Sequence, residues 1–236
     1  MQPIVIIGAG GMGRTVAWMI ADLNKQHPSW DLVGFVDDNP ALWHQMVGSR
    51  LVQGGIEWLR DQRNIHAICA IGDSLVRKAL VARLQHSTVE FATLIHPSVL
   101  MSESNKIGVG SIISAGCVVT IDVNIGRHVF VGVASTIGHD AELEDCVTVL
   151  PGCNISGGSI VETCAVLGTG SQVIERRRIG AHAVVGAGSV VIRDIPAHCT
   201  AVGVPAKPIK FHSQGLLSAQ MRGLTRRKAC ASSALE

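Results

Sequence analysis

Hydrophobic side chains recur every six residues along the second half of the chain. From Ile95 the sequence divides without insertion into seventeen hexads, from IHPSVL to VIRDIP, and every hexad begins with Ile, Val, Leu or Met. The fifth position is mostly Ser, Ala, Cys or Val, and the second is often Gly. A single phase that persists over residues 95–196 indicates an internal repeat.

A period of six matches neither an α-helix nor an ordinary β-hairpin. It is typical of a solenoid in which each hexad forms one short strand and one corner, and three hexads close a triangular coil. The first-position aliphatic and fifth-position small side chains would then point inward and stack from coil to coil, about 4.8 Å apart. The pattern therefore predicts a prism of parallel β-strands with about five and a half coils.

The pattern is different before residue 95. Apolar runs at residues 4–7, 32–36 and 67–71 predict buried strands, and residues 75–84 predict a helix. A Gly-rich turn that leads into another helical stretch follows the first run. Alternating strands and helices favour an α/β domain with a small parallel sheet of Rossmann-like order.

The Gly-rich turn, GAGGMG, matches the G-x-G-x-x-G pattern of nucleotide-binding loops. It follows a strand, and the acidic pair Asp37-Asp38 ends the next strand. Glycines let backbone N–H groups approach a phosphate at a helix N-terminus, and a carboxylate can accept hydrogen bonds from a ribose or a base. The alternative is a tight turn beside a solvated acidic loop. An NAD-dependent reductase is not favoured, because only about ninety residues precede the prism and a full dinucleotide fold needs more.

Composition excludes several classes of protein. Hydrophobic residues make up 47% of the chain and charged residues 16%, which rules out a disordered protein, and the net charge of +2 gives no argument for nucleic-acid binding. No apolar run approaches the ~20 residues that span a bilayer. The seven Cys residues show no metal-ligand spacing with His, so we expect free thiols in a reducing cytoplasm.

The hexads and the later segment AVGVPAKPIK (201–210) resemble the hexapeptide-repeat acyltransferases, whose prism is a left-handed parallel β-helix. With the Rossmann-like domain in front, the chain resembles the bacterial sugar O- and N-acetyltransferases of the sialic acid O-acetyltransferase type. The resemblance implies a nucleotide-sugar-binding domain (1–94), an acetyltransferase prism (95–210) and a C-terminal extension (211–236). It also implies a homotrimer that binds acetyl-CoA between adjacent subunits, without a metal.

The same resemblance assigns the nucleotide pocket of the front domain. Residues at matching positions are Gly8, Gly10, Gly11, Gly13, Asp37, Asp38 and Gly72. Met12 stands where the family commonly has His, which leaves the preference for a nucleotide base open.

His139 holds the third position of its hexad, which points outward, so core packing does not explain it. Its Gly-His-Asp context matches the general base of the family, and Asp140 would fix its tautomer. Gly157, eighteen residues later, matches the oxyanion donor and would leave room for the thioester. Alternatively, Gly157 is a corner that needs a positive φ. Several relatives carry a second His where this chain has Thr148.

The basic cluster Arg176, Arg177 and Arg178 is either a solvated turn or a site for the phosphates of acetyl-CoA, together with Lys207. We expect His96 to be structural, and His128 and His182 to be surface residues.

The favoured function is acetyl-CoA-dependent N-acetylation of an amino group on a nucleotide-linked sugar, for surface-glycan synthesis. The alternatives are O-acetylation of sialic acid or a related sugar, and a non-catalytic trimeric module that senses a nucleotide.

Overall fold

The three apolar runs of the front half form the centre of a parallel sheet. The computed structural model describes residues 1–212 and places β1 (Gln2–Ile7) between β2 (Trp30–Val36) and β5 (His66–Cys69). Helix α1 (Gly11–Gln26) begins in the Gly-rich turn, and α2 (Ser74–Arg83) follows β5. The predicted α/β order is therefore confirmed.

Short elements that the sequence pattern did not predict extend this sheet. β4 (Arg50–Gly54) pairs in parallel with β2, β3 (Met46–Val47) pairs antiparallel with β4, and β6 (Glu90–Phe91) pairs in parallel with β5. The strand order is β3-β4-β2-β1-β5-β6. Two 3-10 helices, η1 (Pro40–Leu42) and η2 (Ile56–Asp61), flank the β3–β4 hairpin. A strand of two residues is too short to show a period.

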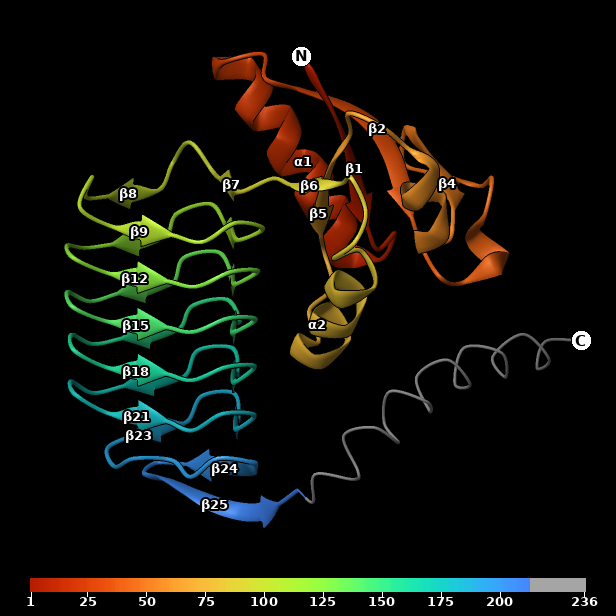
Figure 1. Cartoon of the computed structure of the whole chain (residues 1–236). Helices are drawn as coiled ribbons and strands as arrows, with labels where there is room; N and C mark the ends of the chain where they lie inside the picture. Colours follow the sequence, from red (N-terminus) through yellow and green to blue (C-terminus); the bar gives the residue numbers. More distant parts are fainter. Residues whose placement is uncertain (213–236) are drawn as a thin grey trace, which may run out of the picture.

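The hexads form a triangular prism of three parallel sheets, which we call faces 1, 2 and 3 (Figure 1). Face 1 contains β7 (Leu94–Ile95), β10 (Ile112–Ile113), β13 (Phe130–Val131), β16 (Thr148–Val149), β19 (Val166–Leu167), β22 (Val184–Val185) and the closing hairpin β24 (Cys199–Gly203) and β25 (Ala206–Phe211). Face 2 contains β8 (Leu100–Met101), β11 (Val118–Val119), β14 (Thr136–Ile137), β17 (Asn154–Ile155), β20 (Gln172–Val173) and β23 (Val190–Val191). Face 3 contains β9 (Lys106–Ile107), β12 (Asn124–Ile125), β15 (Glu142–Leu143), β18 (Ile160–Val161) and β21 (Arg178–Ile179).

Each hexad position has one structural role. From Ile113 to Val191 every first-position side chain is at most 3% exposed, and these side chains form the core of the prism. Every fourth position from Gly110 to Gly188 has a φ between +55° and +80°, so the fourth residue turns the chain at each corner. Where the second position is Gly, a side chain would collide with the next coil: a Cβ on Gly138 would lie 2.5 Å from the backbone N of Gly157.

The front domain packs on face 1 and on the corner between faces 3 and 1, which we call the α2 corner (Figure 1). Leu94, Ile112 and Phe130 of face 1 join the apolar cluster between the sheet and α1. Arg77 of α2 is 1% exposed, and no carboxylate of the described residues pairs with it. Its guanidinium instead donates to the carbonyl oxygens of residues 128, 146 and 147 and to those of residues 71 and 72.

This interface corrects one prediction. His128 is not a surface residue: it is 4% exposed, because Phe91 of the front domain packs edge-on against its ring at 4.7 Å. Its neighbour along the same corner, His182, is half-buried. His96 lies between the domains, where its Nδ1 forms a hydrogen bond with Ser98 Oγ over 2.8 Å.

In residues 1–212 no helix is long and apolar enough to cross a membrane.

Candidate active site

The predicted base and its acidic neighbour form a hydrogen-bonded pair at a corner of the prism. His139 and Asp140 lie between β14 and β15, where faces 2 and 3 meet. Asp140 has a φ of +57°, a conformation that Asp tolerates better than most residues. His139 Nδ1 donates to Asp140 Oδ2 over 2.7 Å, and both side chains are about two-thirds exposed. With its proton on Nδ1, the imidazole keeps a free lone pair on Nε2.

Gly157 lies one coil below, directly under the imidazole. A Cβ on Gly157 would lie 2.5 Å from His139 Nε2 and 2.6 Å from Cε1, so only glycine leaves room for the ring. The alternative prediction, that Gly157 needs a positive φ, is wrong because the left-handed residue of this corner is Gly158, with φ +63°. Gly157 is buried, and its N–H makes no hydrogen bond within residues 1–212, so this group is an unused donor.

The Gly-rich loop lies at the carboxyl end of the sheet. Gly8 has a φ of +102°, and a Cβ there would approach Ile71 Cδ1 to 2.6 Å. Gly10 and Gly11, by contrast, have nothing within 4 Å of a Cβ, so no protein contact requires them to be glycine. Gly10 caps α1 without a side-chain hydrogen bond, which leaves the first N–H groups of a sixteen-residue helix open to an anion. Gly13 allows α1 to pack on the strand end, because a Cβ would overlap the carbonyl oxygen of Gly8.

The two acidic residues after β2 have different partners. Asp37 Oδ2 accepts a hydrogen bond from the backbone N of Ala9 in the Gly-rich loop over 3.0 Å. Asp38 Oδ1 accepts from the backbone N of Ile56 over 3.0 Å, and its other oxygen pairs with Arg83. Asp37 is therefore the member of the pair that lies at the loop, and Asp38 holds η2 and α2 together.

The basic cluster also divides by partner. Arg178 pairs with Glu162, and Arg177 lies 3.8 Å from Asp194. Arg176 makes no ion pair within residues 1–212. Its Cγ lies 3.3 Å from the position of a Cβ on Gly158, in the adjacent coil of the same corner. Lys207 is exposed in β25 at the base of the prism.

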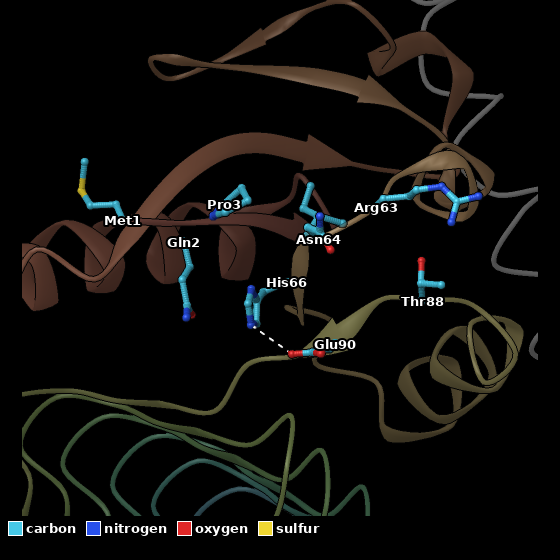
Figure 2. A pocket seen from close by; sticks show the side chains of 9 residues that line it. Met1, Gln2, Pro3, Arg63, Asn64, His66, Thr88 and Glu90 are labelled. Carbon is cyan, nitrogen blue, oxygen red and sulfur yellow. Dashed lines mark ion pairs between the residues drawn. The ribbon is translucent and has the colours of Figure 1, made fainter.

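A separate pocket of about 460 Å³ lies at the opposite edge of the sheet, where β1 and β5 begin. Figure 2 shows His66 and Glu90 facing one another, with His66 Nε2 3.4 Å from Glu90 Oε2. Ligands of parallel α/β sheets bind at the carboxyl ends of the strands, so this pocket is not the predicted nucleotide site. In the described part of the chain, no three His, Cys, Asp or Glu side chains are arranged to hold a metal ion.

Known proteins resemble the chain over nearly all of its length. Residues 3–84 match the family model of the PglD N-terminal domain. GDP-perosamine N-acetyltransferase of Escherichia coli O157:H7 is 30% identical over 216 residues, which cover 87% of this chain and 95% of that enzyme. The chain belongs to the hexapeptide-repeat nucleotide-sugar N-acetyltransferases.

Solved structures of this family agree with the fold. PerB from Caulobacter crescentus, in complex with CoA and GDP-perosamine, has a TM-score of 0.80 at 31% identity and covers 89% of this chain and 98% of its own. The acetyltransferase domain of PglB from Neisseria gonorrhoeae, in complex with acetyl coenzyme A, has a TM-score of 0.80 at 28% identity, with coverages of 88% and 99%. These relatives confirm the left-handed prism behind a Rossmann-like domain and the enzyme class, an acetyltransferase.

Both departures from the family pattern lie against the same glycine. The Sδ of Met12 is 4.0 Å from the position of a Cβ on Gly72. Thr148 Oγ1 donates to the carbonyl oxygen of Gly72 over 3.0 Å and accepts from Arg77 over 2.8 Å. The sequence pattern alone did not show that Thr148 belongs to the contact between prism and front domain.

Proposed function

We propose that the protein transfers the acetyl group of acetyl-CoA to the amino group of a GDP-linked amino sugar. The observation that carries this proposal is the His139–Asp140 pair, whose free Nε2 stands over Gly157. The relatives of matching length and domain order are named for N-acetylation of GDP-perosamine, which favours an amine over the hydroxyl of a sialic acid. The outward catalytic pair also speaks against a non-catalytic module.

The geometry of the His139–Asp140 pair indicates which atom accepts the proton during the reaction. When the sugar amine attacks the thioester carbon, its nitrogen must lose a proton, and Nε2 of His139 accepts it. Asp140 keeps the other proton on Nδ1 and stabilises the imidazolium that forms. As the carbonyl oxygen becomes negative, the unused N–H of Gly157 donates to it. Collapse of this intermediate expels the coenzyme A thiolate, which takes up a proton.

The front domain supplies the other half of the site. The open N-terminus of α1 at Gly10 and Gly11 binds the diphosphate, and Asp37 and Gly72 border the nucleoside. We assign Asp38 to support of the loop, because Arg83 and the backbone of Ile56 use both of its oxygens. At the prism, Arg176 and Lys207 are the cations available to the phosphates of acetyl-CoA.

We infer a homotrimer from the chemistry of the prism faces. Face 3 carries charged outward side chains: Lys106, Glu142, Glu144, Glu162 and Arg178. Within the described prism, face 2 has no charged outward position: Leu100, Ser102, Val118, Thr120, Thr136, Gly138, Asn154, Ser156, Gln172, Ile174, Val190 and Ile192. An uncharged face of this length suits burial against a second copy. His139 stands at its edge.

The position of the front domain supports a shared active site. Its Gly72 loop contacts Thr148 on face 1, whereas His139 lies at the corner between faces 2 and 3. One chain therefore presents its nucleotide loop and its base on different sides of the prism. A neighbouring copy brings the base of one subunit to the loop of the next.

Subunit mixing tests this arrangement. His139→Ala and Asp37→Ala trimers, each nearly inactive alone, should recover activity after they are unfolded and refolded together. Random assembly predicts that about one quarter of the sites combine an intact base with an intact loop. Two inactive parents that yield no activity in verified mixed trimers would contradict the shared site.

Release of free thiol from acetyl-CoA tests the reaction itself. GDP-perosamine should support turnover, and the same nucleotide sugar with a hydroxyl in place of the amine should not. His139→Ala should lower kcat by about 10²–10⁴ while the trimer is retained. Full activity of a verified His139→Ala trimer would overturn the assignment of the base.

We also assign the enzyme to the cytoplasm, because its buried cysteines at positions 69, 117, 146, 153, 164 and 199 are all free thiols.

A further inference from the structure

The α2 corner carries a column of reactive side chains that the acetyl transfer does not use. His128, Cys146, Cys164 and His182 hold the fourth position in four successive coils, eighteen residues apart. The ladder fixes their register, because the N–H of Cys146 donates to Arg127 O over 2.8 Å and that of Cys164 to Asp145 O over 3.0 Å. The two cysteines at the centre of this column are neighbours across one coil step.

Cys146 and Cys164 occupy the same corner position in adjacent coils. Both residues have a φ of +59°, so their Cα–Cβ bonds leave the corner in the same way. One coil step of about 4.8 Å falls inside the Cα–Cα window of about 4.4–6.8 Å that a disulfide requires. The two side chains are close enough that the thiol of each shifts the pKa of the other.

The surroundings favour a thiolate on one member of the pair. The hydrogen bond from Cys164 lowers the pKa of Cys146; burial and Asp145 oppose this effect, and the charges of Arg77 and Lys78 reinforce it. The same contact and burial raise the pKa of Cys164. A thiolate beside a retained thiol is the arrangement in which an oxidised sulfur is resolved by its neighbour.

The other buried cysteines of the prism lack this arrangement. Cys117 and Cys153 share one inward column but are two coils apart, with Ser135 between them. The thiol of Cys117 donates to Gly132 O over 3.1 Å, and that of Cys153 to Gly168 O over 3.1 Å. Cys117, which is as fully buried as the pair, serves as the internal control.

We propose that Cys146 and Cys164 form an oxidation site that closes into an inter-coil disulfide when a peroxide reaches the α2 corner. The Cys146 thiolate attacks one peroxide oxygen, the O–O bond breaks, and hydroxide leaves and takes up a proton to become water. The sulfur of Cys164 then attacks the sulfenic acid, loses its proton, and expels a second water as the S–S bond forms. Two thiols and one hydrogen peroxide thus give one disulfide and two waters.

The site lies where the front domain is held. Ser74 Oγ donates to the carbonyl oxygen of Cys164 over 2.8 Å, and Arg77 Nη2 donates to that of Cys146 over 2.8 Å. Both cysteines therefore contribute backbone acceptors to α2. A bond between their side chains would tie together the two coils on which α2 rests.

Peptide mapping tests the proposal in the full-length Cys153→Ser, Cys230→Ser protein. Ser already fills the inward column at residues 135 and 171, so Ser is compatible with position 153. Cleavage after glutamate then places Cys146 alone in peptide 145–162 and Cys164 alone in peptide 163–175. After treatment of the folded protein with hydrogen peroxide and alkylation of remaining thiols, we expect these two peptides to be joined and to separate on reduction.

Cys117 should remain alkylated under the same dose, and Cys164→Ser should abolish the joined species and leave Cys146 as its sulfenic or sulfinic acid. Two results would overturn the proposal. One is that both peptides remain alkylated at a dose that oxidises exposed methionines. The other is that joined peptides form only after the protein is unfolded.

Discussion

Substitution of Gly157 by Ala tests whether a side chain at this position would displace the imidazole of His139 in the coil above. The new Cβ would lie 2.5, 2.6 and 2.9 Å from Nε2, Cε1 and Cδ2 of His139. Carbon contacts are optimal at about 3.5–4.0 Å, so the ring must move by about 1 Å. A displacement of that size in a catalytic group costs about 10²-fold in rate, which is the loss of kcat that we expect.

Stability should hardly change, and this separates the effect from unfolding. The His139 side chain is 66% exposed, so its ring can rotate into solvent without leaving a cavity. An exposed pair such as His139–Asp140 contributes about 0–1 kcal/mol, and Gly→Ala at a permitted φ returns about 0.4–1 kcal/mol. The free energy of unfolding should therefore remain within about 1 kcal/mol of wild type.

A double-mutant cycle decides how the alanine acts. If Gly157→Ala works by displacing the imidazole, it should cost almost nothing in a His139→Ala background. If it instead blocks the thioester or the N–H of residue 157, the same loss should appear in both backgrounds. Thiol release gives kcat, a denaturation curve gives stability, and Ser156→Ala in the same turn is the control. Wild-type kcat in Gly157→Ala would refute the steric argument.

Three other perturbations follow from the described contacts. Arg77→Ala should lower the free energy of unfolding by about 2–5 kcal/mol, because it leaves a cavity and removes the donor to buried carbonyl groups on both domains. Urea denaturation measures this change, and a loss below about 1 kcal/mol would contradict the role of Arg77 in joining the domains. Burial, reinforced by Arg127 and Arg77, lowers the pKa of His128 to about 4, so between pH 6.5 and 4 only the unfolded chain gains that proton, and stability falls by up to about 3 kcal/mol. His128→Asn should flatten that part of the pH–stability curve; an unchanged slope would point to other groups. Arg176→Ala should raise KM for acetyl-CoA several-fold without affecting KM for the nucleotide sugar, whereas Arg178→Ala should affect neither KM. Equal effects of the two substitutions would support the alternative interpretation, in which the arginine cluster is a solvated turn without a role in binding.

The prism could be predicted because its inward positions obey a local rule. A coil of three hexads places each first-position side chain beneath the one eighteen residues earlier, so Ile137 stacks between Val119 above it and Ile155 below it. That stacking needs no information from elsewhere in the chain. The small elements of the front domain were not predictable in this way, because β3 and β6 are two residues long and exist only through pairing with β4 and β5.

Outward positions follow no such rule, which explains why the surface position predicted for His128 was wrong. Asp122, His128 and Asp140 share the fourth position of a hexad and the same left-handed φ, yet each has a different environment. Asp122 is exposed, His128 is covered by the front domain, and Asp140 hydrogen-bonds the imidazole of His139. The hexad fixes where the backbone turns. What then covers each corner depends on segments more than thirty residues away, such as Phe91 against His128.

The predicted positive φ at Gly157 was also wrong because the reason for this glycine lies outside its own hexad. A positive φ would have made the glycine a property of the corner, and Gly158 already has that role. The requirement at Gly157 comes instead from the side chain of His139 in the coil above. Neither the backbone conformation at residue 157 nor the prism core accounts for Gly157 and His139, which is consistent with a role of both residues toward a ligand. In the reaction that we propose, that ligand is the acetyl thioester, which contacts Nε2 of His139 and the N–H of Gly157 together.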